Sequence, residues 1–398
     1  MLFPVWAMLW MGCSSNQSSE VLFNTSPVPA ESRPPTESMV RIHKQFGETK
    51  TFSDVLAIDK IVKLQVTESS ILANISDLAI IENHMLVLDG KQSQLFMFDS
   101  EGGFLKQVGR LGQGPGEYIK PAYITADKDR FLLLDTDLRR LIFYDRNGAW
   151  IRSDNLSDSG IFPVGDFLYH HKRIYFPSPI YTRSTDPTLP ENLIYDTVQK
   201  RVLWGFEKRF PLFYKKRPPF KIHYTSFSRV GDRIWFGPPY ISEVFIYDLD
   251  GRFLRKLSPG ISDALSQEDY NSASNRGEFK KVWRSKLANS AIFHLPPYVL
   301  VTFSGKISRF ERMSVFDADG NILAKNFQVK NTVLFPTLLG AHGNHLIGVV
   351  DIDFYLKSAI DAYLTPQQKA MFVAAGWDET GHGDSEDNAY LVFFKVTL

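Results

Sequence analysis

The stretch His84–Asp89 (HMLVLD) is followed by Gln94–Gly102 (QLFMFDSEG), and the same pattern returns as Arg130–Asp135 (RFLLLD) followed by Arg140–Gly148 (RLIFYDRNG). Each copy holds two short apolar segments that end on Asp. The second Asp begins a turn that ends on Gly. Short apolar runs bounded by turn residues predict β-strands joined by hairpins.

The second Asp recurs along the chain, always after an apolar segment. It is found at Asp99, Asp145, Asp196, Asp248 and Asp317, while a sixth segment, Tyr390–Phe394, lacks it. A repeat of roughly 40–50 residues that holds four short strands is typical of a β-propeller blade. Because a single blade cannot bury both of its faces, the blades must pack side by side. We therefore expect an all-β fold, a six-bladed β-propeller over residues 55–398.

The sixth blade is short of one strand at the C-terminus, where the pattern predicts only Pro336–Ala341, His345–Asp351 and Ala389–Val396. The segment Lys60–Val66 alternates apolar and polar residues before the first blade, so it is the natural donor of the fourth strand. We expect N- and C-terminal strands to pair in one sheet and close the ring. This closure would remove an open sheet edge.

The N-terminus has a different composition. Residues 1–12 are apolar and uncharged, and Cys13, the single cysteine of the chain, follows them. This arrangement resembles a bacterial lipoprotein signal, with Cys13 as the lipid attachment site; an ordinary secretory signal is the alternative. Residues 14–54 are predicted to be a flexible tether, because the stretch to about Ser38 is rich in Pro and Ser and poor in apolar residues. A lone cysteine also excludes an intramolecular disulfide framework.

A resemblance to a known family rests on the segment Gly112–Tyr118 (GQGPGEY) after the first blade and on the final strand within Glu386–Phe394. With the NHL-like repeat of Leu132–Asp135 and Leu141–Asp145, these residues resemble the six-bladed β-propeller lipoproteins of Bacteroidetes-type bacteria. The resemblance covers about residues 55–398. It implies the architecture and a cell-envelope location, with the chain held at a membrane by its lipid and facing the periplasm or cell surface. It implies little chemistry.

The loop of residues 109–118 is the first candidate for a binding site. Its glycines allow tight turns and Pro115 limits its freedom, so we expect a rigid loop between two blades. A phosphate cradle is a weaker alternative, because no Gly-Lys-Ser/Thr follows and no helix N-terminus is predicted there. The polar groups that would rim the mouth of the central channel are those of Arg110, Gln113, Glu117, Tyr118 and, from another blade, His223.

Long connections occur in one class only. The connections from the fourth strand of a blade to the next blade, and from the second to the third strand of a blade, emerge on the same face of a propeller. The long segments 177–191, 206–222, 258–289 and 351–388 are all of these kinds, whereas the other connections are tight turns. Small helices are predicted in two of them, within 263–288 and from Thr365 to Gly376. We expect this loop-rich face to carry recognition.

Two classes of function remain open. The net charge is +1, from 45 basic and 44 acidic residues, so nothing points to nucleic acid. The favoured function is a non-catalytic binding or assembly module on the envelope, with a protein, small-molecule or glycan ligand and no cofactor. The alternative is a propeller-type hydrolase or lyase at the channel mouth. Histidines near inner strands would then converge on a metal; they are His170, His223, His294, His342 and His345. No H-x-H or H-E-x-x-H spacing is present, so we expect no metal or catalytic set. The D-x-D-G turns are interpreted as hairpins and not as calcium loops.

Overall fold

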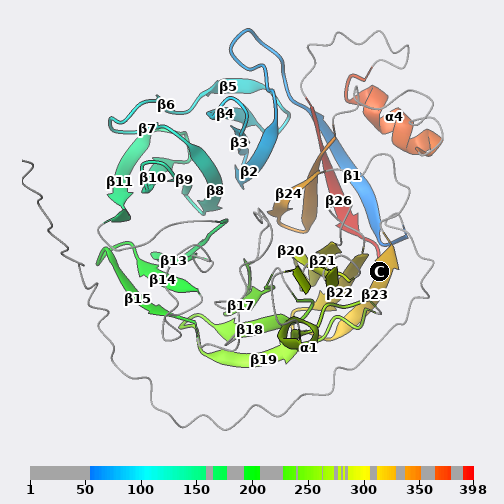
Figure 1. Cartoon of the computed structure of the whole chain (residues 1–398). Helices are drawn as coiled ribbons and strands as arrows, with labels where there is room; N and C mark the ends of the chain where they lie inside the picture. The colour runs from blue at the N-terminus through cyan, green and yellow to red at the C-terminus, as the bar shows by residue number, and fades with distance from the viewer. Residues whose placement is uncertain are drawn as a thin grey trace, which may run out of the picture. The chain divides into compact units, whose positions relative to one another are not determined.

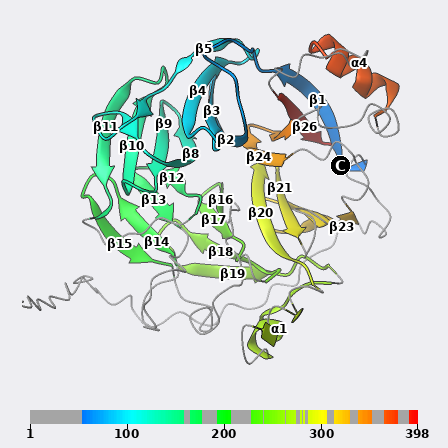
Figure 2. The ribbon, with the colours of Figure 1, turned by 45° about the horizontal axis from the view of Figure 1, so that its top comes forward.

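The computed structural model describes residues 54–157, 165–176, 192–206, 227–238, 241–261, 263–272, 277–278, 281–282, 286–304, 312–328, 337–350, 364–377 and 389–398. These residues form six four-stranded antiparallel sheets arranged as the blades of a propeller (Figures 1 and 2). The fold expected from the repeats is confirmed. Cys13, the segments 1–13 and 14–53, and His223 lie outside the described residues.

In the first five blades the strands follow chain order from the innermost to the outermost. The bounds are, for blade one, β2 (Ile75–Ile81), β3 (His84–Asp89), β4 (Gln94–Asp99) and β5 (Phe104–Gln107); for blade two, β8 (Pro121–Asp127), β9 (Arg130–Asp135), β10 (Arg140–Asp145) and β11 (Trp150–Asn155); for blade three, β12 (Leu168–His170), β13 (Arg173–Phe176), β14 (Leu193–Asp196) and β15 (Arg201–Gly205); for blade four, β16 (Phe227–Val230), β17 (Arg233–Phe236), β18 (Val244–Asp248) and β19 (Phe253–Leu257); for blade five, β20 (Ala288–Leu295), β21 (Tyr298–Ser304), β22 (Arg312–Asp317) and β23 (Ile322–Gln328). The innermost strands of neighbouring blades contact one another around the ring.

Blade six is built from both ends of the described chain. Its strands are β24 (Thr337–His342), β25 (His345–Val350), β26 (Tyr390–Val396) and, outermost, β1 (Leu56–Lys63). β1 pairs antiparallel with β26, from Leu56 opposite Val396 to Lys63 opposite Tyr390. Ring closure by N- and C-terminal strands is therefore confirmed.

The closing strand starts and ends earlier than the predicted Lys60–Val66. The reason lies in the hydrogen bonds of Gln65, whose backbone N–H donates to Gly102 O at 2.8 Å. Its side-chain Oε1 also accepts from the backbone N–H of Phe104 at 2.8 Å. Both partners belong to blade one, so the chain has already left the sixth sheet at this point.

Buried carboxylates end the second strand of blades one and two. Asp89 and Asp135 are fully buried. One oxygen of Asp135 accepts from the N–H groups of Ile119 and Lys120, which lie before the blade, and the other from Asp137 and Leu138 in the following turn. Asp89 makes the same set of bonds in blade one. One side chain thus joins the entry of the blade to its second turn.

In blades one, two, four and five the turns between the third and fourth strands share one hairpin geometry. Asp99, Asp145 and Asp248 each accept from the N–H groups two and four residues later, and Asp317 from the N–H four residues later. The glycines that complete these turns have φ between 73° and 89° at Gly102, Gly148, Gly251 and Gly320. The hairpin interpretation is confirmed. Within the described ranges, no group of three or more His, Cys, Asp or Glu is placed to hold a metal.

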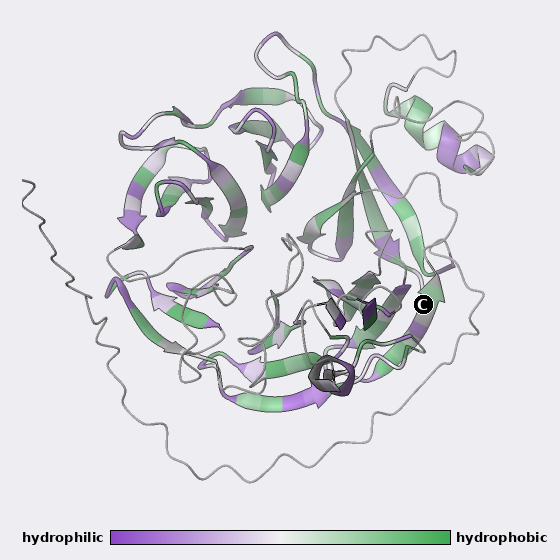
Figure 3. Cartoon of the chain, viewed as in Figure 1, coloured by the Kyte–Doolittle hydropathy of each residue, from purple (hydrophilic) through white to green (hydrophobic). Residues whose placement is uncertain are grey.

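The core lies between neighbouring blades. One cluster joins blades one and two through Leu86, Met97, Phe131 and Ile142, and another joins blades five and six through Phe293 and Phe394. Figure 3 shows hydrophobic residues along the strands of every blade. Burial of each large apolar side chain stabilises the fold by roughly 1.5–3 kcal/mol. These interfaces are therefore the main source of stability.

Two helices are described, and both lie in predicted insertions. α1 (Gln267–Ser272) lies within the 258–289 connection, and α4 (Pro366–Ala374) lies within the 351–388 connection. Thr365 caps α4, because its hydroxyl accepts from Gln368 N–H at 3.2 Å while its own N–H donates to Gln368 Oε1 at 3.0 Å. The chain leaves this helix through Gly376, whose φ is 94°. The capped helix expected from the sequence is confirmed.

Candidate functional site

A cavity of about 320 Å³ lies on the propeller axis, and all six blades contribute to its wall. The wall is made by residues of, or next to, the innermost strands β2, β8, β12, β16, β20 and β24. Each of these strands pairs on one side only. Its other edge faces the axis and leaves backbone N–H and C=O groups that need polar partners. Unpaired backbone groups of the innermost strands therefore make part of the cavity wall polar.

Small residues keep the cavity open. Ala79, Ala126, Gly340 and Ala341 stand in its wall. A Cβ atom added at Gly340 would have only the carbonyl oxygen of Leu78 within 4 Å, at 3.9 Å. A Cβ atom at position 340 would therefore meet no clash.

Two aspartates stand at one end of the cavity, in equivalent positions of blades one and three. Ile81 pairs with His84, and His170 pairs with Arg173, as the last pair before the first turn of each blade. Asp77 and Asp166 each come four residues before that pair. Each also accepts, through Oδ1, the N–H of the next residue at 2.8 Å.

Asp77 reaches into the neighbouring blade. Its Oδ2 accepts from the N–H of Ile124 in β8 at 2.8 Å, which satisfies one backbone donor of that strand. Burial raises the pKa of the Asp77 carboxyl well above its usual range, and the negative charge of Asp166 raises it further. Two carboxyl groups that share a low-dielectric site hold a proton more readily than one.

Basic groups stand at the other end. Arg229 and His294 occupy equivalent positions in blades four and five, one residue before the last pair of their strands, and His342 ends β24. Burial lowers the pKa of His294 and of His342, and Arg229 lowers that of His294 further. Burial, followed by the charge of Arg229, also lowers the pKa of His170 to about 4. These imidazoles are neutral at pH 7, and Arg229 carries the positive charge.

The two ends belong to different faces. Every innermost strand runs from the connection that enters its blade to the tight turn that follows, such as residues 82–83 or 296–297. The aspartates come early in this direction, so they stand on the side of the entering connections. Arg229, His294 and His342 come late, so they stand on the side of the tight turns. The acidic end therefore lies on the side of the loop-rich face expected from the sequence.

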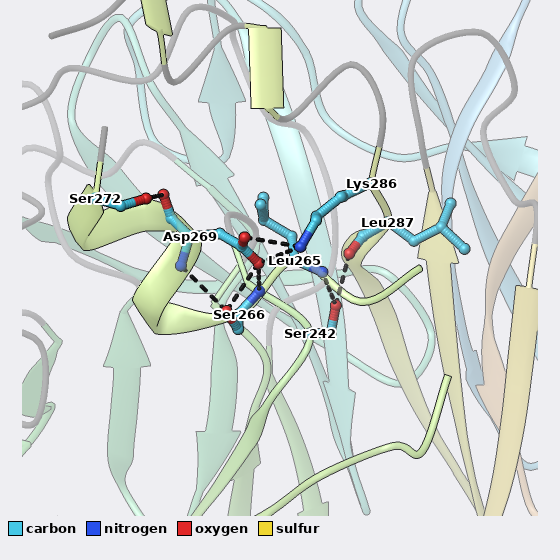
Figure 4. Close-up of polar contacts among 7 residues, drawn as sticks. All are labelled: Ser242, Leu265, Ser266, Asp269, Ser272, Lys286 and Leu287. Atoms are coloured by element: carbon cyan, nitrogen blue, oxygen red, sulfur yellow. Dashed lines mark hydrogen bonds and ion pairs between the residues drawn. The ribbon is translucent and has the colours of Figure 1, made fainter. Parts of the chain in front are cut away.

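One long connection of that face is fixed to the propeller at both of its ends (Figure 4). Ser242 Oγ donates to Leu287 O at 2.6 Å and accepts from Leu265 N–H at 3.0 Å. Lys286 contacts both carboxylate oxygens of Asp269 in α1, at 2.6 and 2.7 Å. A buried hydroxyl and an ion pair thus hold the start and end of the 258–289 insertion together.

The residues of the 109–118 loop that were predicted to rim the channel lie away from the cavity. β6 (Arg110–Leu111) and β7 (Glu117–Tyr118) form a small parallel pair. The loop packs against Trp150 in β11, the outermost strand of blade two, where a Cβ at Gly116 would lie 2.9 Å from Trp150 Cβ. None of these residues is among those that line the cavity. The geometric expectation of a channel rim is thus not met for this loop.

The polar groups of the loop bind one another. Glu117 Oε1 pairs with Arg110 Nε at 2.6 Å, and its Oε2 accepts from Gly114 N–H at 2.8 Å. These hydrogen bonds and the charge of Arg110 lower the pKa of Glu117. The carbonyl of Gln113 accepts from Arg140 at 2.8 Å. The Glu117 carboxylate therefore acts first as a clamp that closes the loop.

Tyr118 is fully buried between blades one and two. Its hydroxyl donates to Val108 O at 3.0 Å and accepts from Leu95 N–H at 3.2 Å, and burial raises its pKa to about 12. These contacts give Tyr118 a structural role. Ligand binding by Arg110, Gln113, Glu117, Tyr118 and His223 stays a prediction.

Sequence reasoning missed Asp77, Asp166 and Arg229. A weak signal was available, because both aspartates precede two apolar residues in equivalent positions (Asp77-Leu-Ala and Asp166-Phe-Leu). Aspartate next to a strand more often caps a turn, so the signal gains meaning only with the register. The histidines His170, His294 and His342 were recognised as lying near inner strands, and the structure places them at the turn end of the channel.

Comparison with known proteins agrees with this architecture. A family model described as "Domain of unknown function (DUF4934)" matches residues 39–317. No curated protein matches the chain. The solved structure of a putative exported protein from Bacteroides fragilis is similar, with a TM-score of 0.63, 18% identity, and coverage of 89% of this chain and 99% of that one.

A second similar structure is a member of the DUF4221 family from Bacteroides vulgatus. It has a TM-score of 0.55 and 14% identity, and the match covers 86% of this chain and 98% of that one. At these identities both likenesses show the fold alone. Among the described helices, neither is long and apolar enough to cross a membrane.

Proposed function

The chain belongs to the DUF4934 family, and on that premise we propose that it is a non-catalytic binding module that holds a small polar ligand in the central cavity. The observation that carries the proposal is the cavity wall: six blades surround one space whose wall combines apolar residues with a few charged and polar groups. This is the usual composition of a ligand site. The loop-rich face would admit the ligand past the acidic end.

The location we propose is the cell envelope, with the propeller anchored through lipid on Cys13. The support is the sequence pattern of residues 1–13 and the similarity to a protein described as exported. Expression of Cys13→Ala in a bacterial host should move the protein from the membrane fraction to the soluble fraction. Equal membrane association of both forms would contradict the lipid anchor.

A cavity-filling variant tests the binding site. Because Gly340 has open space where its side chain would be, Gly340→Leu should fold with nearly unchanged thermal stability and occupy the cavity. We would screen amino acids, short peptides, sugars and polyamines by thermal shift on the wild type and on this variant. At least one compound should stabilise the wild type and not Gly340→Leu.

The control for the screen is Gly343→Ala. Gly343 also has open space around it, but it lies in the turn after β24 and outside the cavity wall. This variant should respond to ligand as the wild type does. A panel that stabilises neither protein, or one that stabilises Gly340→Leu equally, would contradict the proposal.

The alternative function is a propeller-type hydrolase or lyase, and the Asp77–Asp166 pair is the observation that favours it. A carboxyl group with a raised pKa beside a second carboxyl group is an arrangement that general acid–base catalysis uses. Mass spectrometry of each bound compound after incubation separates the two functions. Recovery of unchanged ligand supports the binding module, whereas conversion that is lost in Asp77→Asn supports the enzyme.

A further inference from the structure

The cavity carries opposite charges at its two ends, and they stand on different blades. Asp77 and Asp166 come from blades one and three, while Arg229 comes from blade four. By register, the acidic level lies three residues before the level of Arg229 along the inner strands. Three residues of β-strand span roughly 10 Å. The charges therefore lie at opposite ends of one space.

The acidic end suits a cationic group. Asp77 accepts hydrogen bonds from the backbone N–H groups of Leu78 and Ile124, and no cationic side chain contributes to the shift of its pKa. A carboxylate has room for more than two hydrogen bonds. An ammonium group placed between Asp77 and Asp166 would relieve the repulsion that now raises the pKa of Asp77.

The basic end suits a carboxylate. Arg229 directs one nitrogen to Gly231 O at 3.1 Å, and the other N–H groups of a guanidinium remain as donors in a fixed fork. The neutral imidazoles of His294 and His342 are further hydrogen-bonding groups in the wall. Asp127 and Asp232 also act on His170 at this end, so the positive charge is local to Arg229.

The middle of the cavity is mostly apolar. Ile124, Phe167, Phe227, Ile292, Phe293 and Leu339 belong to this part of the wall, together with the polar residues Thr125 and Ser228. A ligand with charged ends and an uncharged centre would match the wall along its whole length. Free backbone edges of the inner strands would supply hydrogen bonds to amide groups in that centre.

We propose that the ligand is a short peptide of about three residues with both ends free, its ammonium group at Asp77 and Asp166 and its carboxylate at Arg229. An extended chain of three residues is about 10 Å long, which is the spacing of the two charged levels. The inference rests on the proposed binding function and adds the chemical class of the ligand.

Titration calorimetry with trialanine tests the proposal. Trialanine should bind the wild type, and N-acetyl-trialanine and trialanine amide, which each lack one charge, should bind about 10-fold or more weakly. Gly340→Leu should not bind trialanine. Equal affinity for trialanine and either blocked peptide would overturn the proposal.

Charge variants assign the two ends. Arg229→Gln should weaken trialanine about 10-fold and leave trialanine amide unchanged, while Asp166→Asn should weaken trialanine and leave N-acetyl-trialanine unchanged. Arg201→Gln, on the outermost strand of blade three, is the control and should have no effect. Thermal unfolding of each variant verifies that it folds. If Arg229→Gln and Asp166→Asn fold and bind trialanine as the wild type does, the assignment is wrong.

These experiments distinguish a failure of the peptide proposal from a failure of the proposed binding function. If sugars or polyamines stabilise the wild type but not Gly340→Leu, and trialanine does not bind, the cavity is a binding site and the peptide proposal is wrong. If no compound of the panel binds at all, both proposals fail.

Discussion

Blades one and two differ from blades four, five and six in the residue at one register position, the fifth after the first residue of the second strand. Where the first two blades have the buried carboxylates of Asp89 and Asp135, the later blades have Pro238, Phe303 and Val350. The carboxylate binds four backbone N–H groups and closes the next connection within residues 90–93 or 136–139. Its absence goes with the longer connections 237–243, 305–311 and 351–389.

This difference accounts for the unequal lengths of the connections between the second and third strands of the blades. A buried carboxylate can only be retained if its hydrogen bonds are satisfied, so it requires a short turn that presents N–H groups. An apolar residue or a proline at that position has no side-chain acceptor that needs backbone N–H donors. Blades that lack the carboxylate can therefore carry longer connections at this position.

The largest loss of stability is expected when ring closure is removed, because blade six takes its fourth strand from the N-terminal segment. Deletion of residues 1–66 removes β1 and the buried side chains of Leu56 and Val62, and should cost at least about 5 kcal/mol and expose the edge of β26. Thermal unfolding and light scattering would measure the loss of stability and the aggregation. Deletion of residues 1–38, which the sequence predicts to be a tether, should be nearly neutral. Equal behaviour of the two deletions would contradict closure.

The carboxylate of blade two should be the next most sensitive point. Asp135→Ala leaves four backbone N–H groups without their acceptor, and we expect a loss of about 3–4 kcal/mol in the free energy of unfolding. Asp145→Ala, in the same blade, removes the acceptor of only two N–H groups and should cost about 1 kcal/mol. Denaturant titration measures both. Equal losses would show that the buried carboxylate has no special role.

The contact between blade one and the closing strand can be tested at Gly102. A Cβ atom there would lie 2.2 Å from Lys63 O in β1, and the residue has φ of 89°. Gly102→Ala should therefore cost about 2–3 kcal/mol, the sum of backbone strain and a clash. Gly231→Ala has a similar φ of 60° but open space, so it should cost about 1 kcal/mol. The difference between the two, measured by denaturant titration, isolates the contact.

The smallest effect on stability is expected from the titration of Asp77 in the cavity wall. The folded protein holds a proton on Asp77 more tightly than the unfolded chain does, because the pKa of Asp77 is raised from its ordinary value near 3.8. Its contribution to stability is present below that value and is lost as the pH rises through the raised pKa. The stability of the wild type relative to Asp77→Asn should therefore fall with increasing pH. A relative stability that does not change between pH 4 and pH 8 would contradict the raised pKa.

The sequence alone determined the repeat and hence the propeller. Strands such as His84–Asp89 and Arg130–Asp135 are short, apolar and bounded by Asp and Gly, so local patterns were sufficient to find them. The alternation of residues near 60 also identified the donor of the closing strand. The capped helix after Thr365 was found in the same way, since capping depends only on neighbours in the chain.

Only the tertiary structure decided which polar residues meet. Tyr118 and Glu117 look available in the sequence, yet the packing of blades one and two uses the hydroxyl of the first, and the loop itself uses the carboxylate of the second. Asp77 and Asp166 are 89 positions apart in the chain and share an electrostatic environment because equivalent residues of different blades converge on the axis. Local patterns report local hydrogen bonds, whereas the cavity exists because six strands, each with one free edge, surround the same line.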